Sequence, residues 1–377
     1  MGSPRPVHLI NFSRKLTINS IFFLAPLYFL RLGFSGWQIG VITSLYAFAP
    51  LLFSFPTGWL NDRLSIKEVI HAALALLSIL FLLMSRVQEF LPLAFIFLLL
   101  GLANNVLDVS INNLYYKDET NIDPNKKYGR LVFWQALGSA AGPFLGGVVI
   151  TSWSFPTLFV IFALFLLLLQ AFVRPLNHVR FGVVPLKVYR SNLLNKKTIL
   201  FSIMIFIVGL HWGVEGTVYS PFLKRYFNLT TLDLSIYISL SLFIMALSSF
   251  LIGFVKHDVR VNKRLFLLSM LLSGSGLVLM VNPSLSLSFF FRVVHETGDG
   301  FLGALVVLFI SRLFERESIG GSSAILLTVM TLGHMVGALV FSSLGFHFGL
   351  AYPFLVAGLL LVANSAFGVY CFRNVEY

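Results

Sequence analysis

Twelve long apolar runs constrain the fold of this chain more than any other feature of its sequence. Each run holds about 20 residues rich in Leu, Phe, Ile and Ala, the length that an α-helix needs to cross the hydrocarbon core of a bilayer. Polar and apolar residues do not alternate in these runs, as they do in the strands of a membrane β-barrel. The runs lie near residues 13–33, 37–60, 68–86, 90–116, 130–152, 154–173, 198–223, 232–256, 263–282, 285–312, 321–345 and 348–372. We therefore predict an all-α integral membrane protein with twelve transmembrane helices.

The composition supports a membrane protein and excludes most soluble classes. Hydrophobic residues make up 57% of the 377 residues and charged residues only 11%, too few to cover the surface of a soluble domain. The single cysteine, Cys371, excludes an internal disulfide and a cysteine-based metal cluster. The segment Met1–Lys15 has no small-residue cleavage site, so we expect the first run to be an uncleaved helix. We also expect a monomer that needs no cofactor.

Basic residues are distributed unevenly between the two sides of the predicted bundle. With the N-terminus inside, the inner segments hold 22 of the 27 Lys and Arg residues. The outer loops hold four, and one remains inside a helix: Arg31, Arg86, Lys224 and Arg225 are the outer four, and Arg292 is the last. Basic loops face the cytoplasm, so both termini are predicted to be cytoplasmic, in a plasma or inner cell membrane. This bias explains the net charge of +12 without a nucleic-acid partner.

The chain divides into two similar halves. A basic stretch at 175–197 separates residues 1–174 from residues 198–377, and each half contains six apolar runs. A shift of 195 residues aligns the halves without a gap and places "GFSGWQIG" on "NLTTLDLS" and "GWLNDRL" on "GFVKHDV". Two parallel six-helix repeats with a central site at their interface are a known plan of secondary transporters. We predict two six-helix bundles, related by a pseudo-twofold axis and joined by a basic cytoplasmic linker.

Two motifs resemble signatures of the major facilitator superfamily. The loop "GWLNDRLSIK" (58–67) is similar to the pattern G-x-x-x-D-R-x-G-R-K, although Ser65 and Ile66 replace a Gly and an Arg. The stretch "GRLVFWQALGSAAGPFLGG" (129–147) is similar to the helix-five pattern G-x8-G-x3-G-P-x2-G-G, which is associated with proton-driven antiporters. The resemblance implies the fold of that superfamily and transport by alternating access. It also implies a central cavity lined by helices one, four, seven and ten.

The first motif contains two predicted gating residues. Asp62 and Arg63 lie at the cytoplasmic end of the second helix, where the N-terminus of helix eleven should arrive. A carboxylate beside a helix N-terminus is stabilised by roughly 0.3–1 kcal/mol when it is exposed. Asp62 is therefore a candidate latch that holds one conformation of the transporter. A solvated turn that only satisfies the charge bias is the alternative interpretation.

The second motif supplies the other predicted gating residues, Gly142, Pro143 and Gly146. The glycines allow close approach of another helix, and the proline bends its own helix. Gly333 and Gly337 lie 191 residues after the two glycines, so the second half carries its own version of the pattern. Duplication favours a packing role, whereas the family signature favours a role in antiport. The sequence leaves both interpretations open.

Six ionisable residues interrupt the seventh and tenth apolar runs, although one ionised side chain costs roughly 2.5–3.5 kcal/mol at the bilayer centre. His211 and Glu215 lie about 40° apart on one helix face. The other four lie on one stripe about 100° wide. They are Arg292, His295, Glu296 and Asp299. The two faces must therefore meet a watery cavity or each other.

The charge of this cluster predicts proton coupling. With ionised carboxylates, neutral histidines and one arginine the net charge is −2, and a low dielectric then favours proton uptake. The lactose permease branch of the superfamily is similar in having an Arg–His–Glu proton site. We predict that the proton-coupling residues are Glu215, Arg292, His295, Glu296 and Asp299. A static, fully paired network between the two helices is the alternative.

Polar residues of the fourth and seventh runs are the candidates for substrate binding. Asn104, Asp108 and Asn112 share one stripe that can contact a polar or cationic substrate. A packed polar seam between helices explains the same stripe equally well. His211 and Trp212 of the seventh run complete the predicted substrate-binding set.

These features predict a proton-driven transporter that exports small organic molecules by antiport. Phe97 stands where drug antiporters usually carry an arginine, which weakens export and keeps proton symport of a polar nutrient as the alternative. Two His–carboxylate pairs also suit a divalent metal transporter, although Arg292 opposes a cation. The segment "HETGD" (295–299) resembles a zinc-protease motif but has no third ligand, so we do not expect an enzyme. The expected partners are the substrate, protons and the lipid bilayer.

Overall fold

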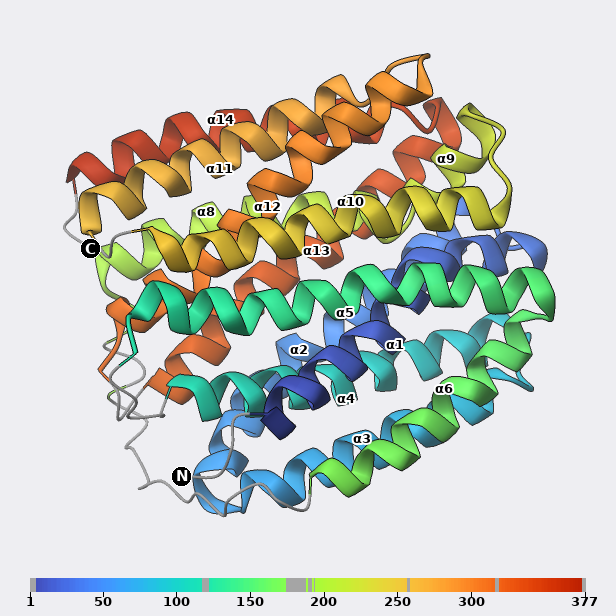
Figure 1. The fold of residues 1–377 in the computed structure, drawn as a ribbon, viewed down its shortest axis with the longest axis horizontal. Coiled ribbons are helices and arrows are strands. Elements are labelled where there is room, and N and C mark those ends of the chain that lie inside the picture. Colours follow the sequence, from blue (N-terminus) through green and yellow to red (C-terminus); the bar gives the residue numbers. More distant parts are fainter. Residues whose placement is uncertain are drawn as a thin grey trace.

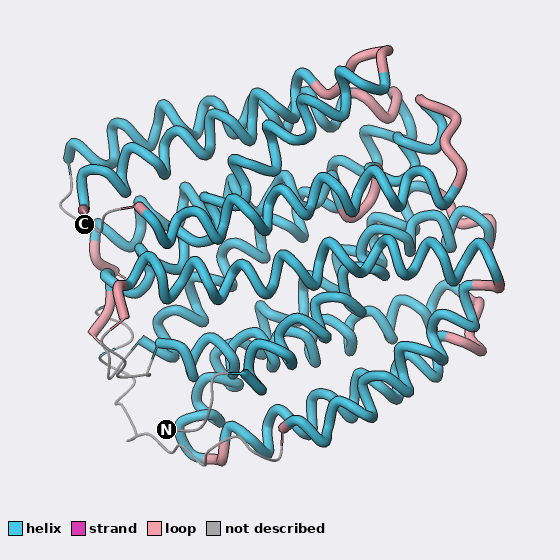
Figure 2. The backbone as a smooth tube through the Cα atoms, viewed as in Figure 1, coloured by secondary structure: helices cyan, strands magenta, loops and turns pink. Residues whose placement is uncertain are grey.

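The computed structural model describes residues 5–116, 122–173, 194–255, 258–315 and 319–374, together with residues 188 and 192. Within these residues every regular element is a helix, and the long helices lie side by side along one direction (Figures 1 and 2). α1 (Arg5–Arg31) begins and α14 (Tyr352–Asn374) finishes at the same end of the bundle, which we call the terminal end. The other end is called the opposite end. The predicted all-α fold is confirmed.

The described residues of each half contribute six passages through the bundle. The first half also contains α2 (Gly36–Arg63), α3 (Ile66–Met84), α4 (Phe90–Tyr116), α5 (Pro124–Ser152), α6 (Phe155–Leu169) and the short η1 (Gln170–Phe172). The second half contains α8 (Lys196–Glu215), α9 (Tyr219–Tyr226), α10 (Thr231–Leu251), η2 (Ile252–Phe254), α11 (Val259–Leu279), α12 (Leu285–Leu313), α13 (Ile319–Phe348) and α14. Because α9 continues α8, the passages number twelve. Ten helical segments are long and apolar enough to cross a membrane; α1 and α11 are the more polar pair.

The helix bounds confirm the internal repeat. A shift of 195 residues moves α4 onto 285–311, and α12 runs from Leu285 to Leu313. The same shift moves α5 onto 319–347, and α13 runs from Ile319 to Phe348. The 175–197 linker falls largely outside the described residues, so the proposed boundaries between the two bundles remain a prediction.

Glycines pack the first and fifth helices of each half against each other. In the first half, Gly138 and Gly142 of α5 lie so close to α1 that a side chain would collide with its carbonyl groups. Gly333 and Gly337 of α13 lie in the same way against α8. The equivalent glycines are therefore 195 residues apart, and the 191-residue pairing expected from sequence is wrong. Close packing in both halves accounts for these positions.

Three of the predicted spans differ clearly from the structure. The fifth was expected to begin near residue 130, but α5 begins at Pro124. The first was expected to begin near residue 13, but α1 begins at Arg5, so Arg14 and Lys15 lie inside the helix. The seventh was expected to run unbroken over 198–223, but it turns at residues 216–218 between α8 and α9. Gly216 lies at this turn directly against the ring of Phe22 on α1, where a larger residue would not fit.

The two halves are in direct contact at the opposite end of the bundle. The hydroxyl of Ser220 on α9 donates to the carbonyl of Phe23 on α1. The hydroxyl of Ser342 on α13 donates to the carbonyl of Gly36, the first residue of α2, over 2.6 Å. Small residues allow this close approach of the two halves.

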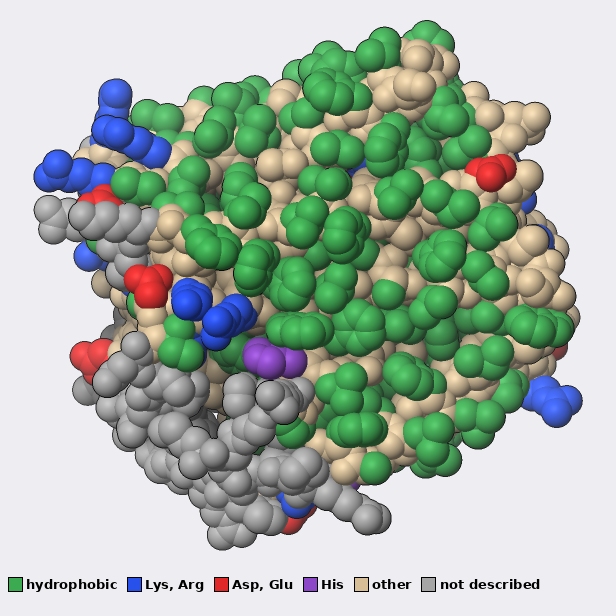
Figure 3. All heavy atoms as spheres, viewed as in Figure 1, with side chains coloured by type: hydrophobic (Ala, Val, Ile, Leu, Met, Phe, Trp, Pro, Cys, Tyr) green, Lys and Arg blue, Asp and Glu red, His purple; other side chains and the backbone are tan. Residues whose placement is uncertain are grey.

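The surface is apolar around the middle of the bundle. In Figure 3, hydrophobic side chains cover most of the visible face, while Lys, Arg, Asp and Glu gather mainly toward its two ends. Large exposed residues such as Leu91, Leu168 and Phe254 would be costly in water but are suited to contact with lipid. The protein is therefore a multi-pass membrane protein.

Candidate functional site

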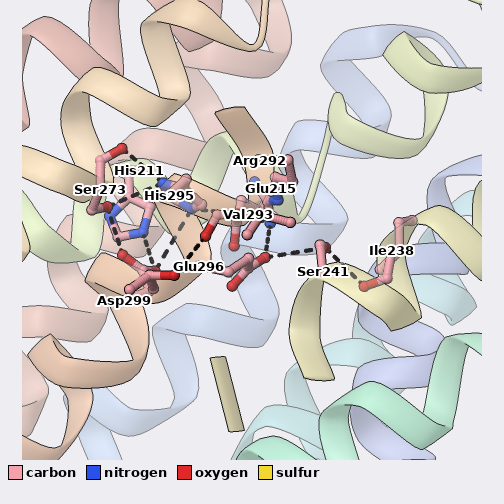
Figure 4. Close-up of polar contacts among 11 residues, drawn as sticks. His211, Glu215, Ile238, Ser241, Ser273, Arg292, Val293, His295, Glu296 and Asp299 are labelled. Atoms are coloured by element: carbon pink, nitrogen blue, oxygen red, sulfur yellow. Dashed lines mark hydrogen bonds and ion pairs between the residues drawn. The ribbon is translucent and has the colours of Figure 1, made fainter. Parts of the chain in front are cut away.

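Six ionisable side chains meet between α8 and α12 (Figure 4). α8 supplies two of them and α12 supplies four at spacings of three and four residues, which place them on one helix face. The residues are His211, Glu215, Arg292, His295, Glu296 and Asp299. None has a side chain more than 8% exposed. The two helix faces that the helical spacing identified therefore meet each other. We call these six residues the C-half cluster.

Arg292 lies between two glutamates in this cluster. Its Nη2 is 2.5 Å from Glu215 Oε1 and 2.5 Å from Glu296 Oε1. The ring of Tyr219 lies on another side, with its centroid 4.2 Å from the guanidinium carbon. Nε and Nη1 have no hydrogen-bond partner in the described part of the chain. The buried guanidinium of Arg292 thus contacts two carboxylates and an aromatic ring. Any change in the charge of either glutamate alters the electrostatic environment of this guanidinium.

The hydrogen bonds of His295 require a proton between this ring and Glu215. Nδ1 lies 2.9 Å from the backbone carbonyl of Ser273, which only accepts, so Nδ1 carries a hydrogen. Nε2 faces Glu215 Oε1 at 3.2 Å. If neither atom held a hydrogen, the ring lone pair would lie against a carboxylate oxygen. One proton therefore occupies this contact, on the imidazole or on the carboxyl group.

Asp299 accepts from two side chains. The hydroxyl of Ser273 donates to Oδ1 over 2.6 Å, and His211 Nε2 lies 3.0 Å from Oδ2. His211 Nδ1 is buried and has no partner within the described residues, which suits a neutral ring whose only N–H points at Asp299. With one proton at His295, the three carboxylates and Arg292 leave the C-half cluster with a net charge of −1.

A cavity of about 320 Å³ lies between the two halves beside this cluster. Glu215, Glu296 and Asp299 line it, whereas Arg292 and His295 lie behind them. Four of the predicted substrate-binding residues also line the cavity, namely Asn104, Asp108, Asn112 and Trp212. His211, the fifth, contacts Asp299 and does not line the cavity. Carboxylates predicted for proton coupling and polar groups predicted for substrate thus share one space.

The first half has a charged cluster of its own, which the sequence did not reveal. Arg14 of α1 is fully buried, and its Nη2 lies 2.5 Å from Asp108 Oδ1. Lys15 Nζ lies 3.6 Å from the same oxygen, and the amide of Asn104 donates to the other carboxylate oxygen over 3.2 Å. Asn11 accepts from the same guanidinium. We call these residues the N-half cluster.

This cluster corrects the charge count made from the sequence. Arg14 and Lys15 were counted among the 22 basic residues outside the membrane, but both lie within α1. A substrate-binding carboxylate would be expected to be free to accept from a ligand. Asp108 is already paired with Arg14. An isolated carboxylate in an apolar run needs a basic partner, and this rule could have predicted from the sequence that Asp108 has one. The partner stands 94 residues earlier in the chain, so no local pattern identifies it.

The predicted gating residues of α5 do not line the cavity. Gly142 and Gly146 of α5 pack against α1 at Leu16 and Ser20, and Pro143 lies between them without ending the helix. Asp62 and Arg63 are the last residues of α2, and their side chains are outside the described structure. The latch proposed for Asp62 therefore remains a prediction.

Three polar residues that line the cavity each have a buried side-chain atom without a partner. These atoms are His334 Nε2 on α13, Asn105 Nδ2 and Asn112 Oδ1 on α4, and none has a hydrogen-bond partner among the described residues. Buried polar atoms without partners are rare in proteins, and those beside a cavity are suited to water or a ligand. His334 and Asn105 were not among the residues selected from the sequence.

Two repeats of six membrane helices around a central cavity define, by architecture, a secondary transporter. The family profile described as Major Facilitator Superfamily matches residues 7–188 and 201–376. The chain therefore belongs to this superfamily of membrane transporters, as the two motifs suggested.

Solved structures of the same fold cover almost the whole chain. The human organic anion transporter MFSD10 (TETRAN) superposes with a TM-score of 0.77 at 16% identity, covering 98% of this chain and 100% of that one. A bacterial homologue of the human lysosomal transporter Spinster, inward-facing and occupied, gives a TM-score of 0.76 at 15% identity and covers 100% and 98%. The nucleoside transporter NupG gives 0.73 at 15% identity, covering 99% and 100%. At these identities the likeness shows the fold alone.

Curated relatives match a shorter part of the chain. The multidrug resistance protein MdtG of Erwinia billingiae (strain Eb661) is 28% identical over 124 residues, which are 33% of this chain and 30% of that protein. The protein of the same name from Rahnella sp. (strain Y9602) is 29% identical over 128 residues, or 34% and 31%. The chain thus spans less than a third of the length of these relatives.

Proposed function

We propose that this protein is a proton-coupled transporter that exports small organic molecules in exchange for protons by alternating access. The observation that carries the proposal is the contact of His295 Nε2 with Glu215 Oε1, which needs one proton to be favourable. Glu215 also lines the central cavity. A proton site and a substrate cavity that share a side chain meet the basic requirement of a coupled carrier.

The shared carboxylates favour antiport over symport. A cationic group that pairs with Glu215, Glu296 or Asp299 in the cavity stabilises the ionised carboxylate and so opposes proton binding. By linkage, the proton weakens substrate binding by the same factor, which produces exchange. Symport of a polar nutrient, the alternative, needs the opposite coupling, in which an anionic group gains from the added proton. The relatives named for multidrug resistance agree with export.

Arg292 supplies a route from the proton site to the contacts between the two halves at the opposite end of the bundle. Its guanidinium stacks on Tyr219, whose ring lies 6.0 Å from the ring of Phe23 on α1. The next residue, Ser220, donates to the Phe23 carbonyl across the two halves. Protonation of Glu215 removes one of the charges that hold Arg292. The arginine then shifts toward Glu296, and its altered contact with Tyr219 loosens the interface.

A divalent-cation transporter is the second candidate. His211, His295 and Asp299 each offer a donor atom, and these atoms lie within 4.8 Å of one another. Such nitrogen and oxygen donors suit Zn²⁺ or Mn²⁺. Arg292 places a fixed positive charge beside them, so organic export ranks first. A metal carrier would gain thermal stability with Zn²⁺ or Mn²⁺, and His211→Ala would remove that gain.

The proposed orientation places the terminal end in the cytoplasm of a plasma or inner cell membrane, with the protein acting as a monomer. The excess of basic residues at that end supports it. Cysteines introduced at Lys126, in the first turn of α5, and at Arg86, between α3 and α4, test it by membrane-impermeant labelling. Labelling at Arg86 from the cytoplasmic side would reverse the orientation.

The direct test is probe uptake into proteoliposomes under proton gradients of either sign. The probes are ethidium as an organic cation, uridine as a polar nutrient and radioactive Mn²⁺. Antiport predicts that an acidic lumen drives accumulation of ethidium, and that Glu215→Gln abolishes this accumulation while exchange of ethidium persists. Glu89→Gln, in an exposed loop, is the matched control and should behave as wild type. Accumulation driven only by external acid would replace antiport with symport.

A further inference from the structure

The cavity has two charged walls of opposite sign. On the wall formed by α1 and α4, Arg14 and Lys15 carry two positive charges against the single carboxylate of Asp108. This wall therefore has a net charge of +1. The wall formed by α8 and α12 has a net charge of −1 when the proton is at His295. The cavity between them is neutral overall but strongly dipolar.

The surplus positive charge is accessible from the cavity. Arg14 is fully buried, and its donors go to Asp108, Asn104 and Asn11. Lys15 lines the cavity, and its side chain is 20% exposed. An ammonium group has three N–H donors, and the Asp108 oxygen 3.6 Å away is already bound by the guanidinium. Lys15 can therefore bind an anionic group of a ligand.

The surplus negative charge is also accessible. Glu296 and Asp299 line the cavity from α12, and Glu215 lines it from α8. Arg292, which offsets part of their charge, lies behind them. A cationic group in the cavity meets carboxylate oxygens first. It has no need to approach the buried guanidinium.

The space between the walls suits an organic body with a few polar groups. Aromatic and aliphatic side chains form most of it, including Phe22, Tyr46, Trp212, Met245 and Met330. The unpartnered atoms of Asn105, Asn112 and His334 add hydrogen-bonding positions. A volume of about 320 Å³ is at the small end of the range for ligand pockets.

We infer that the cavity binds a small zwitterionic organic molecule, with its anionic group toward Lys15 of α1 and its cationic group toward Asp299 and Glu296 of α12. This inference rests on the proposed transport function and names its substrate class. A pure cation leaves the positive charge of Lys15 without a partner. A pure anion must lie in a cavity lined by four carboxylates, three of them on the α8 and α12 wall. A zwitterion satisfies both walls, and its cationic group still competes with the proton.

Matched probes separate these charge classes. Three scaffolds are used, phenylalanine, phenylalanylglycine and 4-(aminomethyl)benzoic acid, each as the zwitterion, as its methyl ester and as its N-acetyl derivative. The ester keeps only the cation and the acetyl form keeps only the anion. Binding to the purified full chain is measured by calorimetry. For at least one scaffold the zwitterion should bind at least tenfold more tightly than both of its derivatives.

Variants then test the assignment of the walls. Lys15→Gln should weaken the best zwitterion about tenfold and leave its ester unchanged, while Lys15→Arg should retain most of the affinity. Lys126→Gln, at an exposed position of α5, is the control. An ester or an acetyl form that binds as tightly as its zwitterion would overturn the inference, and so would a complete lack of binding by all nine probes.

Proton release on binding distinguishes this inference from the proposed function. If the esters bind best and still release a proton, the substrate class is wrong and antiport stands. If a zwitterion binds best but releases no proton, and its transport does not respond to a proton gradient, the proposed proton coupling fails. The charge complementarity between the zwitterion and the cavity walls then still holds. We expect the tightest binding by a zwitterion, together with the release of a proton.

Discussion

The two halves of the transporter use equivalent helices to hold charge in different ways. Under the 195-residue shift, Asn104 of α4 corresponds to Asp299 of α12. Each contacts a side chain from the first helix of its own half, Arg14 at 3.0 Å in one and His211 at 3.0 Å in the other. The N-half position is a neutral amide beside a permanent cation, whereas the C-half position is a carboxylate beside a titratable ring.

This difference assigns separate tasks to the two clusters. Among the described residues, no histidine contacts a side chain of the N-half cluster. Asp108 pairs there with the guanidinium of Arg14, which stays charged at any physiological pH. The C-half cluster has three carboxylates, two histidines and one arginine, so it has both surplus negative charge and groups that exchange protons. We therefore propose a fixed charge in the first half and the movable proton in the second.

The largest expected effect comes from removing a proton-binding carboxylate. Glu215→Gln should reduce gradient-driven accumulation to the passive level, because the amide can donate to His295 Nε2 and no proton is needed there. Exchange of substrate should persist, since exchange does not require the proton to cycle. Asp299→Asn and Glu296→Gln should behave in the same way. Transport by these variants is measured in proteoliposomes with and without a gradient.

Asp108→Asn is the matched variant in the other half. It should keep its response to the proton gradient even if substrate affinity changes. Full gradient-driven accumulation by both Glu296→Gln and Asp299→Asn would show that the C-half stripe is structural. Loss of coupling in Asp108→Asn alone would reverse the tasks of the two clusters.

The second prediction concerns stability. Arg14→Met removes the closer of the two cations beside Asp108 and leaves only Lys15, 3.6 Å away. The change should destabilise the protein by about 3 kcal/mol, the low end for buried pairs because that carboxylate is 27% exposed. Arg14→Met with Asp108→Leu should recover most of the loss, since apolar side chains of similar size replace a buried pair well. Thermal unfolding in detergent gives both values. If the double variant is no more stable than the single one, the pair has a role beyond its own charge balance.

The third prediction tests the contact between Arg292 and Tyr219. Tyr219→Leu removes a cation–π contact worth about 0.5–2 kcal/mol and should shift the bundle toward opening at the opposite end. Tyr219→Phe is the control, because the Tyr219 hydroxyl has no partner within the described residues. Distances between spin labels on α2 and α13 report the shift. Equal distance distributions in the two variants would remove Tyr219 from the proposed route.

The smallest expected effect belongs to the proposed latch. Asp62→Asn should weaken closure at the terminal end by roughly 0.3–1 kcal/mol, if the carboxylate interacts with the N-terminus of α13. Crosslinking between cysteines at the end of α2 and the start of α13 measures that closure. An unchanged crosslinking yield together with normal transport would identify Asp62 as a turn residue only.

Most of the fold could be predicted because its signals are local. Apolar runs of membrane length locate the helices, and the repeat appears as one constant shift. Helical spacing alone brought His211 and Glu215 onto one face, and the structure joins that face to α12. The start of α1 was misjudged for a reason that is also local. Arg14 and Lys15 look like loop residues near an N-terminus, and only their packing against Asp108 explains why they lie within the bundle.

The chemistry of the site depends on contacts that no spacing reveals. The hydrogen on His295 Nδ1 follows from the carbonyl of Ser273, which belongs to α11 and has no recognisable motif. The cavity atoms of His334 and Asn105 are likewise identified by the absence of described partners. Such features depend on how separate helices meet. The sequence could therefore predict the charged stripe but not the position of its proton.

The central claim is that the C-half cluster exchanges a proton and the N-half cluster does not. The most direct measurement counts the protons released by purified protein, with a pH dye, when the solution is taken from mildly acidic to mildly alkaline. Glu215→Gln should release one proton fewer than the wild type, and Asp108→Asn should release the same number as the wild type. Equal counts for wild type and Glu215→Gln, or a deficit in Asp108→Asn, would contradict the account.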